Sequence, residues 1–532
     1  MPAGLSVPVE VQYLICRQDC LEIKDVARLA RTSRVWYDVA NSIVWEKLEG
    51  LDPLLKLLPE DAWSARYGPS PKYRYPFRVE NYKAIRINRN LHAKDWLHVI
   101  KLSCLVRELV LEYVPMRNQV EIGRGRPKRP ILPALKDITF SWTRESASDF
   151  FGPFIAALVP KTLTHLDMTD LYHNRFSIPL IVPYCRSITH LYLNESFSRR
   201  GTEWDENYIL SIIKELHRCP RLTHVDMSLE LDTNRKVFQA LSECPALAKL
   251  SVELAFNYSA TKGGWGWYGP PAYSGERHTG FCALEVLELM GGPFCHATDI
   301  ISADTERRMT HIDIMSDYAW EESSDLCDLT RAVEDHCTHE SLRRFHVSWA
   351  DDGNAKDADE WPLLFEHIAP LIAFHNLTAV SLTDFDGMTL TDDNCTQMAR
   401  AWPQLQRVDF TPVGIQEADP LCTRKGFAAF ARYCPDLYSV ALPFNASSVP
   451  SSDAAAPAIA RLSRINISIF NYAPIKDARD VVRFFSDVYP AKELQVKLAK
   501  HSTRVDPSLE DDPELLTRCA SWSDVCELAA EI

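Results

Sequence analysis

Histidine and aspartate residues recur together in short segments where apolar and polar residues alternate. Imidazole and carboxylate groups at such spacing are the ones that bind metal ions or transfer protons. Three segments carry such a pair: His165 and Asp167, His224 and Asp226, and His311 and Asp313. Two further segments have a histidine at the same spacing from another polar residue: His190 and Tyr192, and Arg344 and His346. A solvated polar strand face produces the same column more often than a site does. We therefore predict a polar surface that helps to choose a partner, with no metal ligands and no catalytic residues.

The 15 cysteines are the next candidates for chemistry, and none of them forms a Cys-x-x-Cys pair. Cys16 and Cys20 lie four apart on a predicted helix, but no second pair with metal-ligand spacing accompanies them. We expect both to pack in a core. Four others stand just before strand-like segments: Cys185, Cys219, Cys244 and Cys434. This placement favours small buried residues in a reducing compartment over disulfides.

Catalytic motifs are missing from the chain. It has no Gly-x-Ser-x-Gly elbow, no Walker loop and no dinucleotide fingerprint. We therefore expect a non-catalytic protein without cofactors.

The charge balance argues against nucleic acid as a partner. The formal net charge is -14, and the basic run at 123–130, GRGRPKRP, is short and rich in Gly and Pro, as in an exposed loop. The start of the chain lacks the pattern of a secretory signal, and no apolar stretch reaches membrane-spanning length. We expect a cytoplasmic or nuclear protein, or one found in both compartments.

Residues 5–50 carry the spacing of three short amphipathic helices. Apolar residues recur at helical intervals in three sets: Val7, Val11, Leu14 and Ile15; Val26, Leu29 and Ala30; and Trp36, Val39, Ala40 and Ile43. Helices this short are marginal alone and need one another, or a partner, to bury these faces.

The rest of the chain repeats a strand template, apolar-x-x-apolar-x-apolar. It occurs thirteen times, from Val106 to Leu462, with a mean period of about 30 residues. Its first residues are Val106, Leu135, Leu163, Ile188, Leu222, Leu247, Leu284, Met309, Leu342, Leu377, Leu405, Leu437 and Leu462. Helical spacing fills the intervals, as at Phe151–Val159, Ile209–Leu216 and Phe427–Cys434. Such strand–helix units bury their apolar faces by stacking. An open βαβ sheet is the structural alternative.

The N-terminal segment resembles the F-box. The matching stretches are Val7-Pro8-Val9-Glu10-Val11 with Ile15, Lys24-Asp25-Val26, Thr32-Ser33-Arg34-Val35-Trp36 and Val44-Trp45-Glu46-Lys47-Leu48. Val7, Thr32 and Ser33 depart from the family pattern. The resemblance implies docking on a Skp-type adaptor of a cullin ubiquitin ligase. By position, the adaptor contacts would be Val7, Pro8, Val11, Ile15 and Val26. A three-helix cap that binds no partner is the alternative.

The repeats resemble the helix-containing leucine-rich repeat, although the family's Asn or Cys after the strand is mostly missing. The longest interval holds a Gly-rich segment with Trp265, Trp267 and Tyr268. Large aromatic side chains are enriched at interfaces, so these three are candidates for target contact, and a loop folded back on the array is the alternative.

Together these features predict an α/β protein: a three-helix F-box, then a curved solenoid with parallel strands inside and helices outside. The expected organisation is a helical module at 5–50, a linker or cap at 51–100, repeats at 101–490 and a C-terminal cap and tail at 491–532. The expected function is substrate recognition for an SCF-type ubiquitin ligase, with an unknown protein target. The alternative is a repeat scaffold that recruits no ligase.

Overall fold

The computed structural model describes most of the chain. The described residues are 7–69, 81–111, 114–125, 127, 129–141, 151–169, 186–194, 219–230, 234–255, 280–303, 306–316, 322–349, 361–385, 387–412, 419–447, 464–469, 475–489, 494–498 and 513–530. The chain divides into two compact units: the described elements from α1 to α10 belong to the first, and those from β9 to α17 to the second. No helix among the described residues is long and apolar enough to cross a membrane.

Among the described residues, 15 strands belong to one parallel sheet, with its strands in chain order apart from the separate β2–β3 hairpin. In the first unit the strands are β1 (Lys47–Glu49), β4 (Glu108–Leu111), β5 (Asp137–Ser141), β6 (His165–Thr169), β7 (His190–Asn194) and β8 (His224–Glu230). In the second they are β9 (Lys249–Ala255), β10 (Val286–Met290), β11 (His311–Ser316), β12 (Arg344–Trp349), β13 (Ala379–Thr383), β14 (Arg407–Asp409), β15 (Ser439–Ala441), β16 (Ile465–Ile469) and β17 (Leu494–Leu498).

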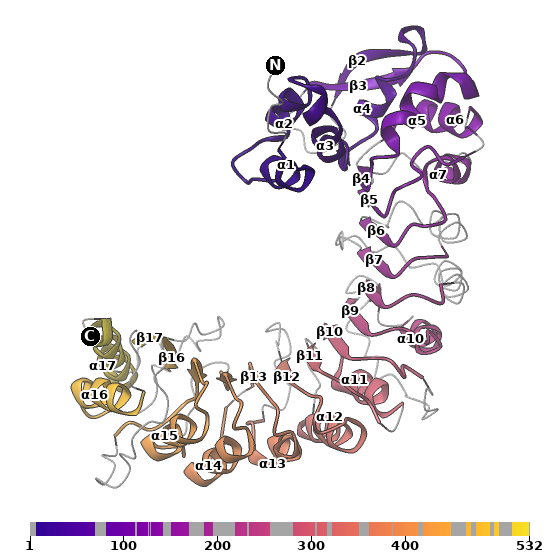
Figure 1. Ribbon diagram of the computed structural model, residues 1–532. Helices are drawn as coiled ribbons and strands as arrows, with labels where there is room; N and C mark the ends of the chain where they lie inside the picture. Colours follow the sequence, from indigo (N-terminus) through magenta and orange to yellow (C-terminus); the bar gives the residue numbers. More distant parts are fainter. Residues whose placement is uncertain are drawn as a thin grey trace. The chain divides into compact units, whose positions relative to one another are not determined.

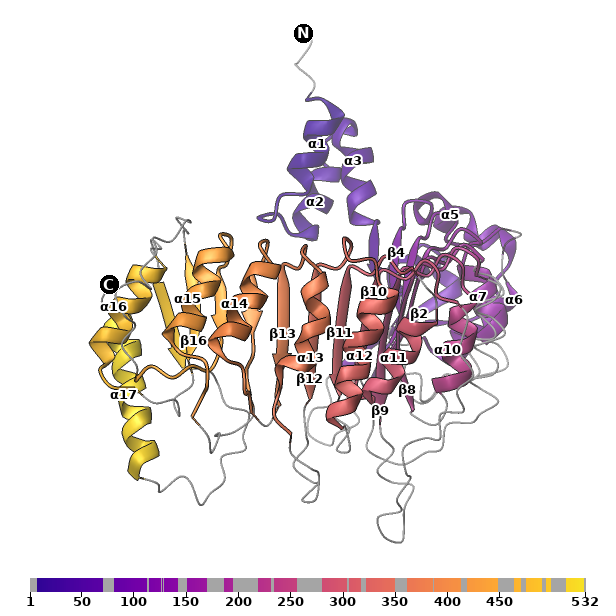
Figure 2. The same ribbon diagram turned by 90° about the horizontal axis from the view of Figure 1, so that it is seen from below.

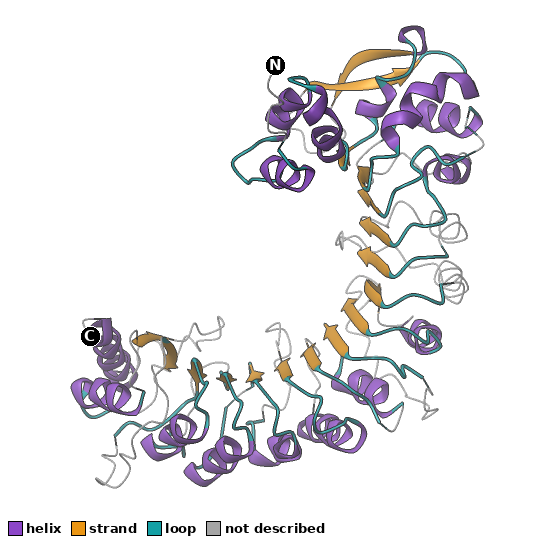
Figure 3. Ribbon diagram, in the orientation of Figure 1, coloured by secondary structure: helices purple, strands orange, loops and turns teal. Residues whose placement is uncertain are grey.

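Helices α1 to α3 all precede the first strand of the sheet, whereas the described helices from α7 to α16 lie between strands and along one side of the sheet in each unit (Figures 1 and 3). The first unit has α1 (Val9–Cys16), α2 (Ile23–Ala30), α3 (Arg34–Val44), α4 (Asp52–Leu55), α5 (Leu97–Ser103), α6 (Met116–Arg124), α7 (Phe151–Leu158) and α10 (Asn234–Ser242). The second has α11 (Phe294–Ser302), α12 (Ser323–His336), α13 (Phe365–Ile368), α14 (Asp392–Ala401), α15 (Arg424–Tyr433), α16 (Ala478–Val488) and α17 (Pro513–Ala530). Short 3-10 turns are η1 (Glu60–Ala62), η2 (Ala93–Trp96) and η6 (Ala369–Ala373).

The strand template of the sequence is confirmed at all thirteen places, each of which is a strand, β4 to β16. Every described residue of the template is at most 3% exposed, whereas Leu462 lies outside the described residues. Equivalent positions pair in register, as Leu109 does with Ile138 and Leu287 with Ile312. The alternating apolar residues therefore form one side of the sheet, on which the helices pack.

The strand order speaks against the open βαβ sheet. A doubly wound sheet reverses its strand order at a switch point and carries helices on both faces. Here successive strands simply lie next to one another, and Figure 2 shows those of the second unit side by side. The architecture is therefore α/β and solenoid-like.

Three features differ from the expectation. The sheet extends beyond 101–490 at both ends, because β1 pairs with β4 and β17 with β16. Within 51–100, β2 (Trp63–Pro69) and β3 (Asn81–Ile87) form an antiparallel hairpin. Cys20 is exposed, since α1 ends at Cys16 and only Cys16 reaches the core. The predicted helix at 209–216 lies outside the described residues.

Candidate functional site

The N-terminal module, defined here as helices α1 to α3, has its own small core. Its buried members are Cys16, Val26, Ala30, Val39, Ala40 and Ile43, with Tyr13, Leu21, Leu29, Trp36 and Val44 packed against them. The apolar residues of the second and third helical sets form most of this core, because both helices place their i, i+3 and i+4 residues inward.

Helix α1 differs from α2 and α3, because it buries a polar side chain and exposes apolar ones. Gln12 and Cys16 are its buried residues, while Val9 is 61% and Leu14 63% exposed. The Gln12 Nε2 group donates to the backbone oxygen of Val7 at 2.6 Å, which partly compensates the burial of this polar side chain. Helix α1 therefore presents apolar side chains to solvent.

The exposed apolar residues of the described chain concentrate in this module. Eight of the 15 large exposed hydrophobic side chains lie between residues 7 and 37: Val7, Val9, Val11, Leu14, Ile15, Ile23, Val35 and Tyr37. Single exposed apolar residues are ordinary, but a concentration of them marks an interaction surface.

Four of the five predicted adaptor contacts belong to this surface. Val7, Val11 and Ile15 are 38–42% exposed, and Pro8 is exposed as well. Val26 is different, because it is 1% exposed and lies in the core of the module. The prediction of Val26 as a contact residue is therefore corrected: its side chain stabilises the module and is not available to a partner.

The second candidate region is the polar face of β6, β7 and β8. His165, His190 and His224 occupy the same register position on these neighbouring strands. Their rings stack, with centroids 4.1 Å apart and interplanar angles of 20° and 13°. We call these three side chains the histidine ladder.

Each ring of the ladder contacts the hydroxyl group of the threonine before it. The distance from Nδ1 to the threonine Oγ1 is 2.9 Å for Thr164–His165, 2.9 Å for Thr189–His190 and 2.8 Å for Thr223–His224. The sequence predicted a polar column here but missed this ladder. The signal that could have found it is the Thr-His pair at the same place in three successive strand templates, because equivalent template positions pair in register in this sheet.

Two carboxylates border the ladder. Asp137 pairs in register with His165, and Asp167 follows His165 two residues later on the same face. Burial raises the pKa of both carboxyl groups. Oδ2 of Asp167 accepts a long hydrogen bond from the Thr139 hydroxyl at 3.4 Å, and its Oδ1 is buried with no hydrogen-bond partner among the described residues. Desolvation, then the neighbouring His165 and His224, lower the pKa of His190 to about 4, so this ring is neutral at neutral pH.

On the corresponding face of the second unit, three acidic side chains lie within hydrogen-bond distance of basic side chains. These acids pair with bases on the same or the next strand: Lys249 with Glu288 at 2.6 Å, His346 with Asp313 at 2.8 Å and Arg407 with Asp409 at 2.8 Å. The polar columns of the two units therefore differ in what they offer a partner.

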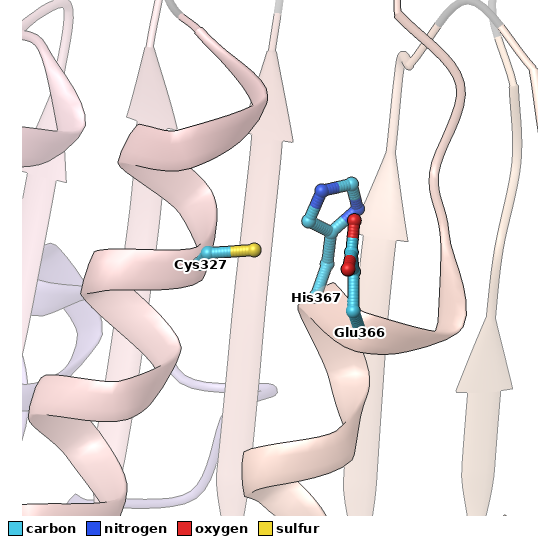
Figure 4. Close-up of side chains that lie close together, drawn as sticks. All are labelled: Cys327, Glu366 and His367. Atoms are coloured by element: carbon cyan, nitrogen blue, oxygen red, sulfur yellow. The ribbon is translucent and has the colours of Figure 1, made fainter.

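One group of three described residues has the composition of a metal site. The donor atoms of Cys327 on α12 and of Glu366 and His367 on α13 lie within 4.8 Å of one another (Figure 4). However, Nδ1 of His367 accepts the backbone N–H of Leu364 at 2.9 Å, and Nε2 lies 2.7 Å from the Ser323 hydroxyl. Burial also raises the pKa of the Cys327 thiol. Since both ring nitrogens are engaged and the thiol is protonated, we infer no metal site here.

The predicted target contacts Trp265, Trp267 and Tyr268 lie outside the described residues. A scan against known protein families and a search of curated proteins each found no match to this chain. What the chain does is therefore inferred from its residues and their geometry.

Proposed function

We propose that this chain is the substrate-recognition subunit of a cullin-type ubiquitin ligase. In this proposal the N-terminal module is an F-box that docks on a Skp-type adaptor, and the repeats, of leucine-rich type, hold a protein target. The protein itself carries out no catalysis and works in the cytoplasm, the nucleus or both.

The exposed apolar surface of the N-terminal module carries this proposal. Exposing apolar side chains to water is unfavourable. Val9, Leu14 and Ile23 of this module are nevertheless each 58–63% exposed. Burying such side chains against a partner releases free energy in proportion to the apolar area removed from water. The sequence of the same stretch resembles the F-box, a docking module. A three-helix cap that served only to cover the repeats would turn these side chains inward.

The repeat array supports the second half of the proposal. Several of its polar strand residues are exposed or half-buried along a stack of parallel strands, as at His165, Tyr192 and Asp313. Solenoids commonly use such extended surfaces to bind other proteins.

A pull-down with a purified Skp-type adaptor tests the docking. Val11→Asp together with Ile15→Asp places two charges on the apolar surface without touching the module's core, so the fold is retained. We expect the double variant to lose at least about tenfold in affinity, because such contacts rest on a few apolar anchors.

The matched control is Leu97→Asp with Met116→Asp. Both residues are exposed hydrophobics outside the module, at 63% and 54% exposure. The control should bind the adaptor as the natural chain does. Equal binding by the natural chain and the Val11/Ile15 variant would remove the docking claim and leave a repeat scaffold that recruits no ligase.

A further inference from the structure

The face of β6 and β7 differs chemically from an ordinary polar strand face, because the threonine hydroxyls beside its first two histidines already donate their hydrogens to the backbone. Thr164 Oγ1 donates to the backbone oxygen of Lys136 at 3.0 Å, and Thr189 Oγ1 donates to that of Thr164 at 3.2 Å. A threonine hydroxyl has one hydrogen, so each of these hydroxyls can only accept from the imidazole that follows it.

Because each threonine hydroxyl has already donated its one hydrogen, the ring nitrogen that faces it must carry a hydrogen. Nδ1 of His165 and of His190 carries the ring hydrogen and donates it to the threonine oxygen. Nε2 is then the unprotonated nitrogen with a free lone pair. Among the described residues, no hydrogen-bond partner is found at Nε2 of either ring. The low pKa of His190, about 4, keeps this acceptor unprotonated at neutral pH.

Two neighbours of these rings are carboxylates, which are acceptors. Asp137 lies beside His165 in the sheet register, and Asp167 lies two residues along the same strand. Neither carboxylate has an ion-pair partner among the described residues, in contrast to the paired acids Glu288 and Asp313 of the second unit. The patch formed by Asp137, His165, Asp167 and His190, called the acceptor patch below, therefore offers lone pairs and negative charge but no exposed ring N–H.

We propose that the acceptor patch binds an arginine side chain of a basic segment in the target protein. The proposal rests on the proposed function only in so far as the repeats hold a protein target. A guanidinium group is cationic, has five N–H donors in one plane and has no acceptor, so it complements a patch of carboxylates and imidazole lone pairs. Lysine supplies the charge but fewer fixed donors.

A metal ion fits this patch less well. The rings of the ladder are nearly parallel, so their lone pairs run alongside one another and do not converge on one ion. A zinc site needs ligand atoms that converge at about 2 Å from the ion. Among the described residues, the group of three potential ligands in close contact lies elsewhere, at Cys327, Glu366 and His367.

The test measures binding of a fluorescein-labelled peptide that alternates arginine with glycine and serine, by anisotropy, on the full chain at physiological ionic strength. Peptides with lysine or glutamate in place of arginine are the comparison probes. Asp137→Asn with Asp167→Asn removes the two charges at nearly constant shape. The matched control is Glu288→Gln with Asp313→Asn, which changes the net charge equally at acids that are already paired.

We expect the arginine peptide to bind more tightly than the lysine peptide and the glutamate peptide not to bind. The Asp137/Asp167 variant should lose about tenfold in affinity and the control less than about twofold. His190→Lys, which replaces an acceptor by a cationic donor, should lose as much as the Asp137/Asp167 variant.

Equal losses in the two charge variants would show attraction to net charge alone and would overturn the proposal. So would absence of arginine-peptide binding, or stoichiometric binding of zinc ion that His190→Gln abolishes. Adaptor binding through the N-terminal module is measured separately, so failure here is distinguishable from failure of the proposed function.

Discussion

Nη2 of Arg17, just after α1, lies 2.9 and 2.7 Å from the two carboxylate oxygens of Glu46, just before β1. This ion pair connects the end of the first helix to the segment that leads from the N-terminal module into the sheet. Arg17 also contacts the Tyr13 hydroxyl at 3.0 Å. These contacts lie at the end of α1, on which four of the eight exposed apolar residues between 7 and 37 lie.

Arg17→Ala tests how much this ion pair stabilises the module. The side chains of Arg17 and Glu46 are 49% and 31% exposed, so water screens the attraction between them. We expect a loss of less than about 1 kcal/mol in the free energy of unfolding, measured by urea denaturation. A loss of several kcal/mol would mean that the pair holds the module together.

Val26→Ala and Val11→Ala separate the core of the module from its surface. Val26 is 1% and Val11 42% exposed. Removing two methyl groups from the core should cost about 2 kcal/mol of stability, and removing them from the surface less than about 0.5 kcal/mol. The affinity for the adaptor should fall with Val11→Ala. Equal stability losses in the two variants would contradict the placement of these side chains.

Arg307→Ala tests a buried guanidinium in the second unit. This side chain is 2% exposed and donates to the backbone oxygens of Ile301, Phe281 and Gly280 at 2.8 to 3.0 Å. Its removal leaves buried carbonyl groups without these donors, so the free energy of unfolding should fall by about 3 kcal/mol. Arg331→Ala, at a residue with a 65% exposed side chain, should change it by less than about 0.5 kcal/mol and serves as the control. Similar values for both would refute the structural role of Arg307.

The buried side chain of His296 should make the folded protein less stable in mild acid. Burial lowers the pKa of this side chain on α11 from 6.5 to about 4. Between these two pH values the unfolded chain binds a proton that the folded chain does not, so stability falls as the pH falls. At pH 5 the loss from this residue should be about 2 kcal/mol. The urea midpoint of His296→Leu should depend less on pH than that of the natural chain, and identical pH profiles would contradict this assignment.

The sequence predicted most of the array because its strand template recurs about every 30 residues and every described position of the template is buried. Leu109, Leu250 and Val440 are each at most 1% exposed, which leaves no room for a polar residue at these positions. The end strands were missed for a physical reason. Lys47–Glu49 forms only three residues of strand, and a segment this short has no detectable alternation.

The surface of the N-terminal module was predicted less completely. Helical spacing identifies an apolar face but cannot tell whether that face meets the protein's own core or a partner. Val26 and Ile15 look alike in sequence, yet Val26 is buried and Ile15 is 38% exposed. The histidine ladder was hidden for a similar reason, because the register between strands is a tertiary property that a single strand does not reveal.

Hydrogen–deuterium exchange of the full chain, with and without a purified Skp-type adaptor, tests the central claim most directly. Apolar docking should slow exchange of the backbone amides in α1 and at the start of α2, where Val9, Leu14 and Ile23 are exposed. The repeats should exchange as before. Unchanged exchange throughout α1 and α2 in the presence of saturating adaptor would contradict the account.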